Sequence, residues 1–444
     1  MDSLQAPPRG ILFDVGDVLL FWPSNPPTII PLRELKKVRY TPTWYRYERG
    51  EITQDVCYEL CAEQFSLSAS EIAQSFVQAR QDTYVNHDMI SFIKELKKDP
   101  AIQVCATSNV GKEEFEEVGN IMDCLAGNQV IFIDDKEENV CAAQALSIRG
   151  LVHGESTIHS LREIFDSPIN KGWRYLFRNG KHCDSVTNTG VAFTDNFARL
   201  MIMDLLKDST MYDLSWGSKK TWNFFAGETS IVPGNVLPDD LDTTSLALIV
   251  LRLPTEKVMS VLDVIAEYVN DDGAFQTYFD RGRARTDPIV SANILTCFYS
   301  FNRGHEFKRT LELIRLFLVD RSYLQGTRYY PSPDCCLGLI GRLLRSSHDS
   351  NLHLALEPLL KMRMRERLGL EGNALDLAMR IITCAQLGIA CEGDRHALLS
   401  MQCEDGSWEA GWVYQCGSTG VKIGNRSVTV ATAIAALSTQ DAVT

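Results

Sequence analysis

Positive charge is in short supply in this chain. Its 444 residues include 44 Lys and Arg against 57 Asp and Glu, so the formal net charge is −13 at pH 7. Proteins that bind nucleic acid need basic patches facing the phosphates, and this charge balance argues against such a partner. An anionic small molecule is not excluded, because a diphosphate needs only a local cluster of Arg, Lys or metal.

Long apolar runs are also missing. No stretch approaches the ~18–20 apolar residues of a membrane-spanning helix, and the segment from Met1 to Gly10 lacks the apolar core of a signal peptide. The 13 Cys are scattered, Cys335 and Cys336 are adjacent, and no C-x-x-C motif offers a zinc site. We therefore expect a cytoplasmic protein with buried, reduced thiols and no membrane span.

The length predicts two domains, and the first has the pattern of an α/β fold. The runs Gly10–Phe13, Ile102–Ala106 and Asn128–Ile133 are short, rich in β-forming residues and followed by polar residues. Buried parallel strands have this pattern, with their chemistry at the carboxyl ends of the strands. The sequence predicts a doubly wound α/β domain over residues 1–166.

The second domain has a helical pattern. From about Trp173 onward, apolar residues recur at helical spacing and the runs are separated by Gly, Pro and Asp turns. Residues 167–172 are the expected linker and 173–444 the expected second domain. Gln402–Trp408 echoes Val269–Phe275, each with Asp-Gly and an aromatic residue two positions later. This echo predicts repeated helical hairpins stacked around a ring.

The motif Asp240-Leu241-Asp242-Thr243-Thr244 stands where an apolar helix begins. One interpretation is purely structural, because carboxylates and Thr cap the free N–H groups of a helix start. The other is catalytic. Protonating an alkene requires a carboxylic acid that stays neutral at pH 7, which burial and a second nearby carboxylate both favour. Asp242 would then be the acid, held by Asp240 and the hydroxyl of Thr243.

Together, Asp240–Thr244 and the Q-x-x-D-G-S-W sequence Gln402–Trp408 resemble the β domain of class II, protonation-initiated terpene cyclases. The resemblance covers roughly Trp173 to the end of the sequence. It implies an all-α (α/α) barrel with Asp242 as the proton donor. Relatives of the squalene and copalyl types use two such helical domains, and this chain has room for one. Farnesyl diphosphate, with fifteen carbons, is therefore the favoured substrate.

Further residues of this half are candidates for substrate binding. Three arginines of one turn would clamp the diphosphate, although a solvated basic turn has the same composition. Asn293 would hydrogen-bond the acid or simply cap a helix. Aromatic side chains would stabilise a carbocation or serve only in helix packing. The candidates are Arg281, Arg283, Arg285, Asn293, Phe275 and Trp408, with Trp412 and Tyr278 as further aromatic residues.

Three segments of the first half resemble the haloacid-dehalogenase-like (HAD-like) superfamily, in the order of its motifs: Phe13–Leu19, Ser108–Asn109 and Phe132–Asn139. The resemblance implies a small helical cap at about residues 25–90. It also implies that Asp14 is a nucleophile and metal ligand and that Ser108 contacts phosphate. The family's acid/base, two residues after the nucleophile, is replaced by Gly16. We therefore expect a domain that binds phosphate or Mg²⁺ and hydrolyses poorly.

Residues Asp134–Glu138 have a second interpretation. They fit D-D-x-x-E, the metal-binding signature of ionisation-type (class I) terpene synthases, although those motifs lie on helices and this one follows a predicted strand. Both interpretations place Mg²⁺ at a diphosphate. The candidate ligands are Asp14, the carbonyl of Gly16, Asp134, Asp135 and Glu138.

A HAD-like domain followed by a class II β domain resembles the domain order of the drimane-type sesquiterpene cyclases of fungi and bacteria. They imply a terpene cyclase that converts farnesyl diphosphate to a bicyclic drimane, of the drimanyl diphosphate or drimenol- or albicanol-like kind, with the diphosphate retained or only partly hydrolysed. Separate phosphatases and oxidases would act downstream. Two alternatives stay open: a HAD-type phosphatase for prenyl diphosphates whose helical domain binds substrate, and a scaffold without activity.

Overall fold

The computed structural model describes residues 8–21, 27–81, 84–99, 102–107, 130–179, 183–217, 220–227, 237–417 and 419–439. The described residues up to Ser167 form one compact unit, and those from Pro168 onward form another. Within these ranges no helix combines the length and the apolar composition needed to cross a membrane.

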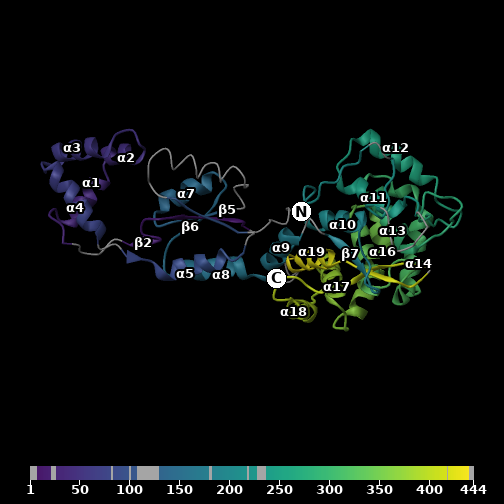
Figure 1. The fold of residues 1–444 in the computed structure, drawn as a ribbon. Coiled ribbons are helices and arrows are strands. Elements are labelled where there is room, and N and C mark those ends of the chain that lie inside the picture. The colour runs from purple at the N-terminus through teal and green to yellow at the C-terminus, as the bar shows by residue number, and fades with distance from the viewer. Residues whose placement is uncertain are drawn as a thin grey trace. The chain divides into compact units, whose positions relative to one another are not determined.

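The N-terminal unit is built on a parallel sheet with the strand order β4-β1-β5-β6. Its strands are β1 (Gly10–Asp14), β4 (Gln103–Thr107), β5 (Val130–Asp134) and β6 (Arg149–Val152). Helices α5 (His87–Leu96) and α8 (Thr157–Asp166) cover one face, and α7 (Glu137–Ala145) covers the other (Figure 1). Phe13 of β1 is fully buried in this core, which explains the continuous apolar run in the sequence.

Strands β2 (Leu20–Phe21) and β3 (Tyr84–Val85) pair antiparallel, and four short helices lie between them in the sequence. They are α1 (Leu32–Arg39), α2 (Pro42–Glu48), α3 (Gln54–Phe65) and α4 (Ala69–Gln81). These helices have a core of their own, in which Trp44 packs against Phe76 with ring centroids 4.7 Å apart. They occupy the position in the chain that the HAD-like resemblance assigns to a cap.

The structure corrects the linker that we expected over residues 167–172. Residues 167–172 are not a loop, because helix α9 runs from Pro168 to Asn179 and only Ser167 separates it from α8. Pro168 fits a helix start, where its missing N–H has no partner to lose, so the Pro-containing run that suggested a linker begins a helix instead. Gly172 of α9 packs so closely on Ile434 that an added Cβ would lie 3.0 Å from Cγ1 of that side chain.

The C-terminal unit is mainly helical. Six of its described helices pack on one another in a closed ring: α10 on α11, α11 on α13, α13 on α15, α15 on α17, α17 on α19, and α19 on α10. They are α10 (Asn196–Leu206), α11 (Leu241–Val250), α13 (Pro288–Ser300), α15 (Pro333–Arg345), α17 (Ala374–Leu387) and α19 (Arg426–Leu437). Nearly every residue of α11 and α13 is buried, as expected of helices enclosed on all sides.

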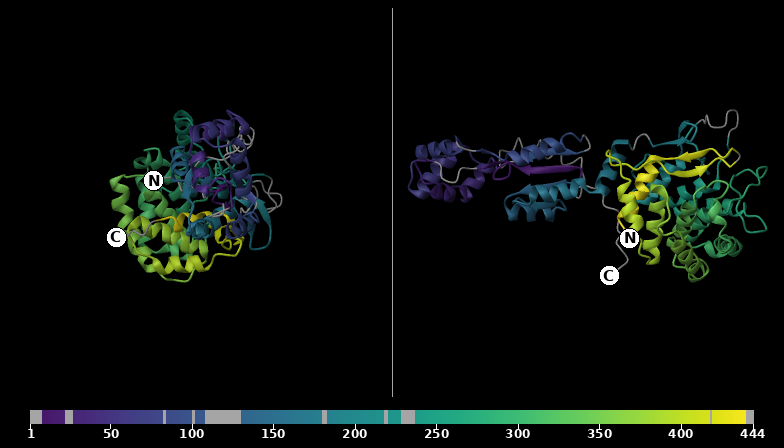
Figure 2. Two further views of the ribbon diagram at one scale, coloured as in Figure 1. Left: turned by 90° about the vertical axis from the view of Figure 1, so that its left-hand side faces the viewer. Right: turned by 90° about the horizontal axis from the view of Figure 1, so that it is seen from below.

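Further helices lie against this ring, and a small sheet completes the unit (Figure 1). The further helices are α9, α12 (Thr255–Ala266), α14 (Lys308–Val319), α16 (Ser350–Arg367) and α18 (Glu392–Ser400). The sheet has the order β8-β7-β10-β9, with β7 (Asp184–Thr187), β8 (Ala192–Thr194), β9 (Trp412–Gln415) and β10 (Lys422–Gly424). In the right panel of Figure 2 the β9–β10 hairpin is seen in yellow along one side of the unit.

The two sequence echoes are structural turns. Gly273 and Gly406 both have positive φ, +86° and +88°, and each approaches a neighbouring backbone so closely that a Cβ would clash. The aromatic residues that follow, Phe275 and Trp408, are fully buried. The indole N–H of Trp408 donates to the carbonyl of Leu398 at 2.8 Å, so this side chain ties the turn to the end of α18.

We predict that Trp408→Phe destabilises the C-terminal unit by about 1–3 kcal/mol, because the smaller ring leaves a void at a fully buried position and the hydrogen bond to the carbonyl of Leu398 is lost. Calorimetric unfolding of the full chain measures the effect. Trp412→Phe, at a half-buried position of β9, is the matched control and should lower the midpoint much less. Equal midpoints for the two variants would contradict the structural role given to Trp408.

Candidate active site

A cavity of about 330 Å³ lies in the C-terminal unit, within the size range of small-molecule sites. Its wall combines aromatic rings, the Asp240–Thr243 segment and two arginines. The aromatic lining residues are Phe197, Phe224, Phe225, Tyr278, Tyr329, Tyr330 and Tyr414. The other lining residues are Leu237, Pro238, Asp240, Asp242, Thr243, Thr277, Arg283, Arg285, Val290, Gln415, Cys416, Gly417 and Ile423.

The start of α11 places Asp242 in this wall. Asp240 is the N-cap, and its Oδ1 accepts the backbone N–H of Thr243 at 2.6 Å. The segment also pairs with a neighbouring loop, since the N–H of Leu241 donates to the carbonyl of Thr277 at 2.9 Å. Asp240 thus has the helix-capping role of the structural interpretation, and both Asp240 and Asp242, two positions further along, line the cavity.

Two residues far away in the sequence complete the surroundings of Asp242. The hydroxyl of Tyr330 donates to Oδ2 of Asp242 at 2.5 Å, and Nδ2 of Asn293 donates to the same hydroxyl oxygen at 3.1 Å. The other oxygen, Oδ1, is buried and has no hydrogen-bond partner among the described residues. Asn293 holds the Tyr330 hydroxyl, and its own side chain also lowers the pKa of Asp242.

Burial keeps this carboxyl group neutral. Desolvation raises the pKa of Asp242 well above its usual 3.8, and the nearby charge of Asp240 raises it further, while the hydrogen bond from Tyr330 opposes the shift. Desolvation also raises the pKa of Asp240, to about 7, against the hydrogen bond from the Thr243 backbone. A neutral carboxylic acid facing an apolar cavity is the group that alkene protonation requires.

Two of the three arginines of the basic turn line the cavity, and one does not. The loop folds back, with the N–H of Thr277 donating to the carbonyl of Arg285 at 2.7 Å, and Arg283 and Arg285 line the cavity. Arg281 does not. Its guanidinium pairs with Glu267 at 3.3 Å and lies over the Tyr268 ring, 5.0 Å from the ring centre. Arg281 is therefore not among the residues that line the cavity, because side chains two residues apart need not face the same way in an irregular loop.

Two predicted aromatic contacts are also corrected. Neither Phe275 nor Trp408 lines the cavity. Phe275 packs against the Phe298 and Phe307 rings, with centroids 5.9 and 5.0 Å away. Trp408 packs against Gly172 of α9. Both rings were assigned to the substrate site from their motifs alone, although aromatic side chains more often pack in the core than line a binding site.

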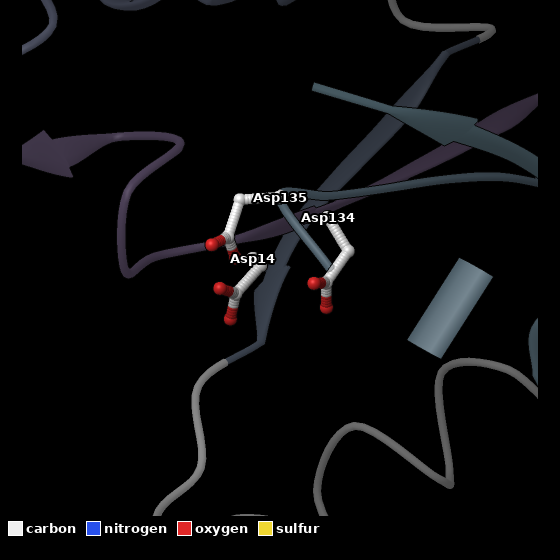
Figure 3. A group of neighbouring side chains, drawn as sticks. All are labelled: Asp14, Asp134 and Asp135. Atoms are coloured by element: carbon white, nitrogen blue, oxygen red, sulfur yellow. The ribbon is translucent and has the colours of Figure 1, made fainter. Parts of the chain in front are cut away.

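A second group of functional side chains lies in the N-terminal unit, at the carboxyl ends of β1 and β5. The carboxylates of Asp14, Asp134 and Asp135 offer oxygens that all lie within 4.8 Å of one another. Figure 3 shows the three side chains turned toward a common space. Asp134 is partly engaged already, since Lys136 N–H and Asn139 Nδ2 donate to its two oxygens at 2.8 and 2.9 Å.

Mutual repulsion and burial raise the pKa of Asp14 to about 7, with desolvation the larger cause and Asp134 the next. The pKa of Asp135 is raised for the same two reasons. Converging carboxylates of this kind fit a hard divalent cation, whose charge would relieve the repulsion.

The remaining predicted residues of this site have different outcomes. Glu138 lies in the first turn of α7, is exposed, and is not part of the three-carboxylate cluster. Its assignment as a ligand therefore has no support from the carboxylates that converge here. Gly16 does lie beside the cluster, because a Cβ there would be 3.7 Å from Oδ2 of Asp14. Ser108 lies outside the described residues.

Comparisons with known proteins identify the family of this chain. A family model described as the sesquiterpene cyclase astC-like C-terminal domain matches residues 169–301. The drimenol cyclase drtB of Aspergillus calidoustus is 35% identical over 464 residues, covering 97% of this chain and 88% of that protein. The chain belongs to the drimane-type sesquiterpene cyclases. It is thus a class II terpene cyclase, whose reaction begins with protonation of its substrate.

Two further proteins are similar to parts of this cyclase. The sesquiterpene phosphatase astK of Aspergillus oryzae is 29% identical over 174 residues, covering 32% of this chain and 88% of that protein. Among solved structures, the type II terpene cyclase MstE from Scytonema matches 62% of this chain and 96% of that one, at 14% identity and a TM-score of 0.45.

Sequence reasoning missed most of the aromatic wall, including Tyr330, which touches Asp242 directly. Tyr330 stands in a Pro- and Ser-rich turn before α15, 88 residues from its partner. No local pattern marks such a contact. Tyr278 was the one named aromatic candidate that does line the cavity.

We predict that Asp240→Asn makes the cyclase more stable at pH 8 and less sensitive to pH. The pKa of Asp240 is raised from 3.8 to about 7 in the folded state, so its contribution to stability is complete below about pH 4 and is lost as the pH rises through about 7. The loss is about 4 kcal/mol at most. Asn is an equally good N-cap and does not ionise.

Unfolding midpoints measured from pH 4 to 8 check this. The exposed Asp272→Asn is the control and should keep the wild-type slope. If Asp240→Asn keeps that slope too, Asp240 does not titrate in this range.

Proposed function

We propose that this cyclase protonates the terminal double bond of farnesyl diphosphate with Asp242 and closes a bicyclic drimane skeleton while the carbon–oxygen bond to the diphosphate stays intact. One observation carries the proposal: a buried carboxyl group lines an aromatic cavity, receives a hydrogen bond from Tyr330 on Oδ2 and has an unpartnered Oδ1 among the described residues. The proton on Oδ1 has no competing acceptor there, so an alkene carbon is its natural target.

The acid must be neutral at rest and yet stable once it has given up its proton. Burial supplies the first condition by raising the pKa of Asp242. Tyr330 supplies the second, because its O–H bond to Oδ2 strengthens when the carboxylate forms. Asn293 holds the Tyr330 hydroxyl from the other side. Tyr330 and Asn293 therefore position and stabilise the acid, while Asp242 transfers the proton.

The rest of the cavity suits the later stages of cyclisation. A carbocation that moves along the folding chain would meet the faces of Tyr329, Tyr414 and Phe224, whose π-electrons attract a cation. Arg283 and Arg285 line the same cavity and reach solvent, so they are suited to hold the diphosphate at its mouth. The substrate would lie between a proton donor at one end and two cations at the other.

For the chain as a whole, we propose a HAD-like domain over residues 1–166, with a cap at about 25–90, and a class II β domain of the (α/α) barrel type from about residue 168. Asp14, Asp134, Asp135 and the carbonyl of Gly16 would hold Mg²⁺ in the first of these. The ion would neutralise phosphate oxygens. With Gly16 in place of the family's acid/base, the domain has no carboxyl group there to protonate a leaving group, so the diphosphate is retained or only partly hydrolysed and separate phosphatases and oxidases act later.

We predict that Asp242→Asn lowers the yield of bicyclic product from farnesyl diphosphate at least about 10³-fold, because the amide has no acidic proton to give. Tyr330→Phe should lower kcat about 10- to 100-fold and leave KM nearly unchanged, since the hydroxyl stabilises the carboxylate formed during the reaction. Product is measured by mass spectrometry after phosphatase treatment.

Asp195→Asn is the matched control for these variants. Asp195 is also a buried carboxyl group whose pKa is raised, to about 6 and chiefly by desolvation, but it is the N-cap of α10 and does not line the cavity. It should keep near-wild-type kcat. Full activity in Asp242→Asn would show that another group is the acid.

We further predict that purified enzyme with Mg²⁺ releases far less than one phosphate for each bicyclic product formed, and that Asp14→Asn removes this release without changing the cyclisation rate. Asp14 lies in the N-terminal unit and contributes nothing to the cavity around Asp242. Phosphate release and bicyclic product, assayed in parallel, check both points. Stoichiometric release of two phosphates would mean that the chain is its own phosphatase.

A further inference from the structure

Tyr330 lies on a short turn before α15, residues 327–330, which we call the Tyr330 turn. The N–H of Thr327 donates to the carbonyl of Tyr330 at 2.8 Å, and the N–H of Tyr330 donates to Oγ1 of Thr327 at 3.1 Å. Strand β9 adds two bonds, since Gln415 donates from its N–H to the carbonyl of Tyr329 at 2.9 Å and from Nε2 to that of Thr327 at 2.7 Å. The position of the Tyr330 side chain therefore depends on what holds this turn.

A carboxyl group that does not line the cavity joins the Tyr330 turn to α13. Asp287 is the N-cap of α13, and its Oδ1 accepts the N–H groups of Ile289 and Val290 at 2.8 and 3.3 Å. Its Oδ2 accepts the N–H of Tyr329 at 3.2 Å. Capping a helix needs only the first oxygen. The second oxygen fixes the backbone beside Tyr330.

Tyr330 is thus attached to α13 at two points. Its neighbour Tyr329 is held by Asp287 at the start of the helix, and its own hydroxyl accepts from Asn293 on the same helix at 3.1 Å. The Tyr330 side chain between these points is buried, and its hydroxyl donates to Oδ2 of Asp242 on α11 at 2.5 Å. A shift of about 1 Å in either group would break so short a hydrogen bond.

Asp287 is suited to this task because a carboxylate accepts hydrogen bonds on both oxygens. The side chain is buried. Desolvation raises its pKa, while hydrogen bonds from the Thr327 side chain and from three backbone N–H groups oppose the rise. All of these groups donate, so a carboxylate satisfies every one of them. An amide of the same shape would turn its N–H₂ group toward some of the donors.

We infer that Asp287 is a positioning residue for proton transfer, which holds the Tyr330 turn so that the Tyr330 hydroxyl stays on Oδ2 of Asp242. The inference rests on the proposed role of Asp242 as the acid. When Asp242 gives its proton to the alkene, the carboxylate that forms accepts a stronger hydrogen bond from Tyr330. A displaced Tyr330 would withhold that bond in the transition state, although substrate would still bind.

A double-mutant cycle between residues 287 and 330 tests this role in the full chain with farnesyl diphosphate. Asp287→Asn keeps an N-cap for α13 but disturbs the hydrogen bonds to the Tyr330 turn. We expect kcat to fall about 10-fold and KM to stay within about two-fold, because Asp287 does not line the cavity. In the Tyr330→Phe background the same substitution should lower kcat less than about two-fold, since no hydroxyl is left to position.

Asp195→Asn is again the matched control. Asp195 caps another helix of the ring, α10, and its Oδ2 accepts the hydroxyl of Ser185 instead of a group of the Tyr330 turn. The substitution should leave kcat near the wild-type value and should not alter the effect of Tyr330→Phe. A purely structural role for Asp287 predicts a different cycle, in which the losses of the two single variants multiply in the double variant.

Three results would overturn the inference: losses that multiply, wild-type kcat in Asp287→Asn, or wild-type kcat in Tyr330→Phe. The last of these would leave Asp242 as the acid but would leave Asp287 nothing to position. Should Asp287→Asn not fold, Thr327→Val removes the hydroxyl that accepts the Tyr330 N–H and bonds Asp287, and it must show the same dependence on residue 330. If wild-type enzyme forms no bicyclic product, the proposed function itself fails, and the inference falls with it.

Discussion

The C-terminal unit depends on keeping one carboxyl group out of water. An ionised Asp at the position of Asp242 would cost several kcal/mol in desolvation, and the protein avoids that cost by holding the group neutral. The neighbours of Asp242 either keep the carboxyl group neutral or stabilise the carboxylate that forms when it gives up its proton. Helix α11 is buried on all sides, Tyr330 contacts one carboxyl oxygen, and Asn293 holds Tyr330. A closed ring of helices is a suitable support, because it surrounds the start of α11 with apolar side chains while irregular segments complete the wall.

The chain uses the same physical effect twice, to opposite ends. In the cavity, burial and a second carboxylate keep Asp242 protonated, so that it can donate. At the end of the parallel sheet, burial and neighbouring carboxylates raise the pKa of Asp14 in the same way, but three oxygens converge on one point. A cation is the ligand that such a group lacks, and its arrival would drive the proton off. A raised pKa alone thus does not tell whether a carboxyl group acts as an acid or as a metal ligand. The arrangement of the neighbouring oxygens decides between the two.

Local patterns in the sequence predicted both of these centres but not their surroundings. Asp240 and Asp242 could be found because a helix start fixes the relation between residues two positions apart, and Asp14, Asp134 and Asp135 because parallel strands end at one edge of a sheet. Tyr330 could not, since its contact depends on the packing of two elements 88 residues apart. The errors have the same origin. Arg281, Phe275, Trp408 and Glu138 each belong to a motif, but a motif does not say which side of its loop or helix faces the site.

The fate of the diphosphate follows from where the chain places its acids. Ionisation of a prenyl diphosphate and protonation of its far double bond are competing ways to start a cation, and an enzyme that does the second must not promote the first. Arg283 and Arg285 can neutralise the diphosphate, whereas the three-carboxylate cluster suited to a divalent cation is formed by residues of the N-terminal unit, none of which lines the cavity. In the proposed reaction, two guanidinium groups polarise the diphosphate less strongly than a divalent cation would, so the carbon–oxygen bond would stay intact while Asp242 acts at the opposite end. Keeping phosphate chemistry and acid chemistry in two units would then favour a cyclised product that still carries its diphosphate.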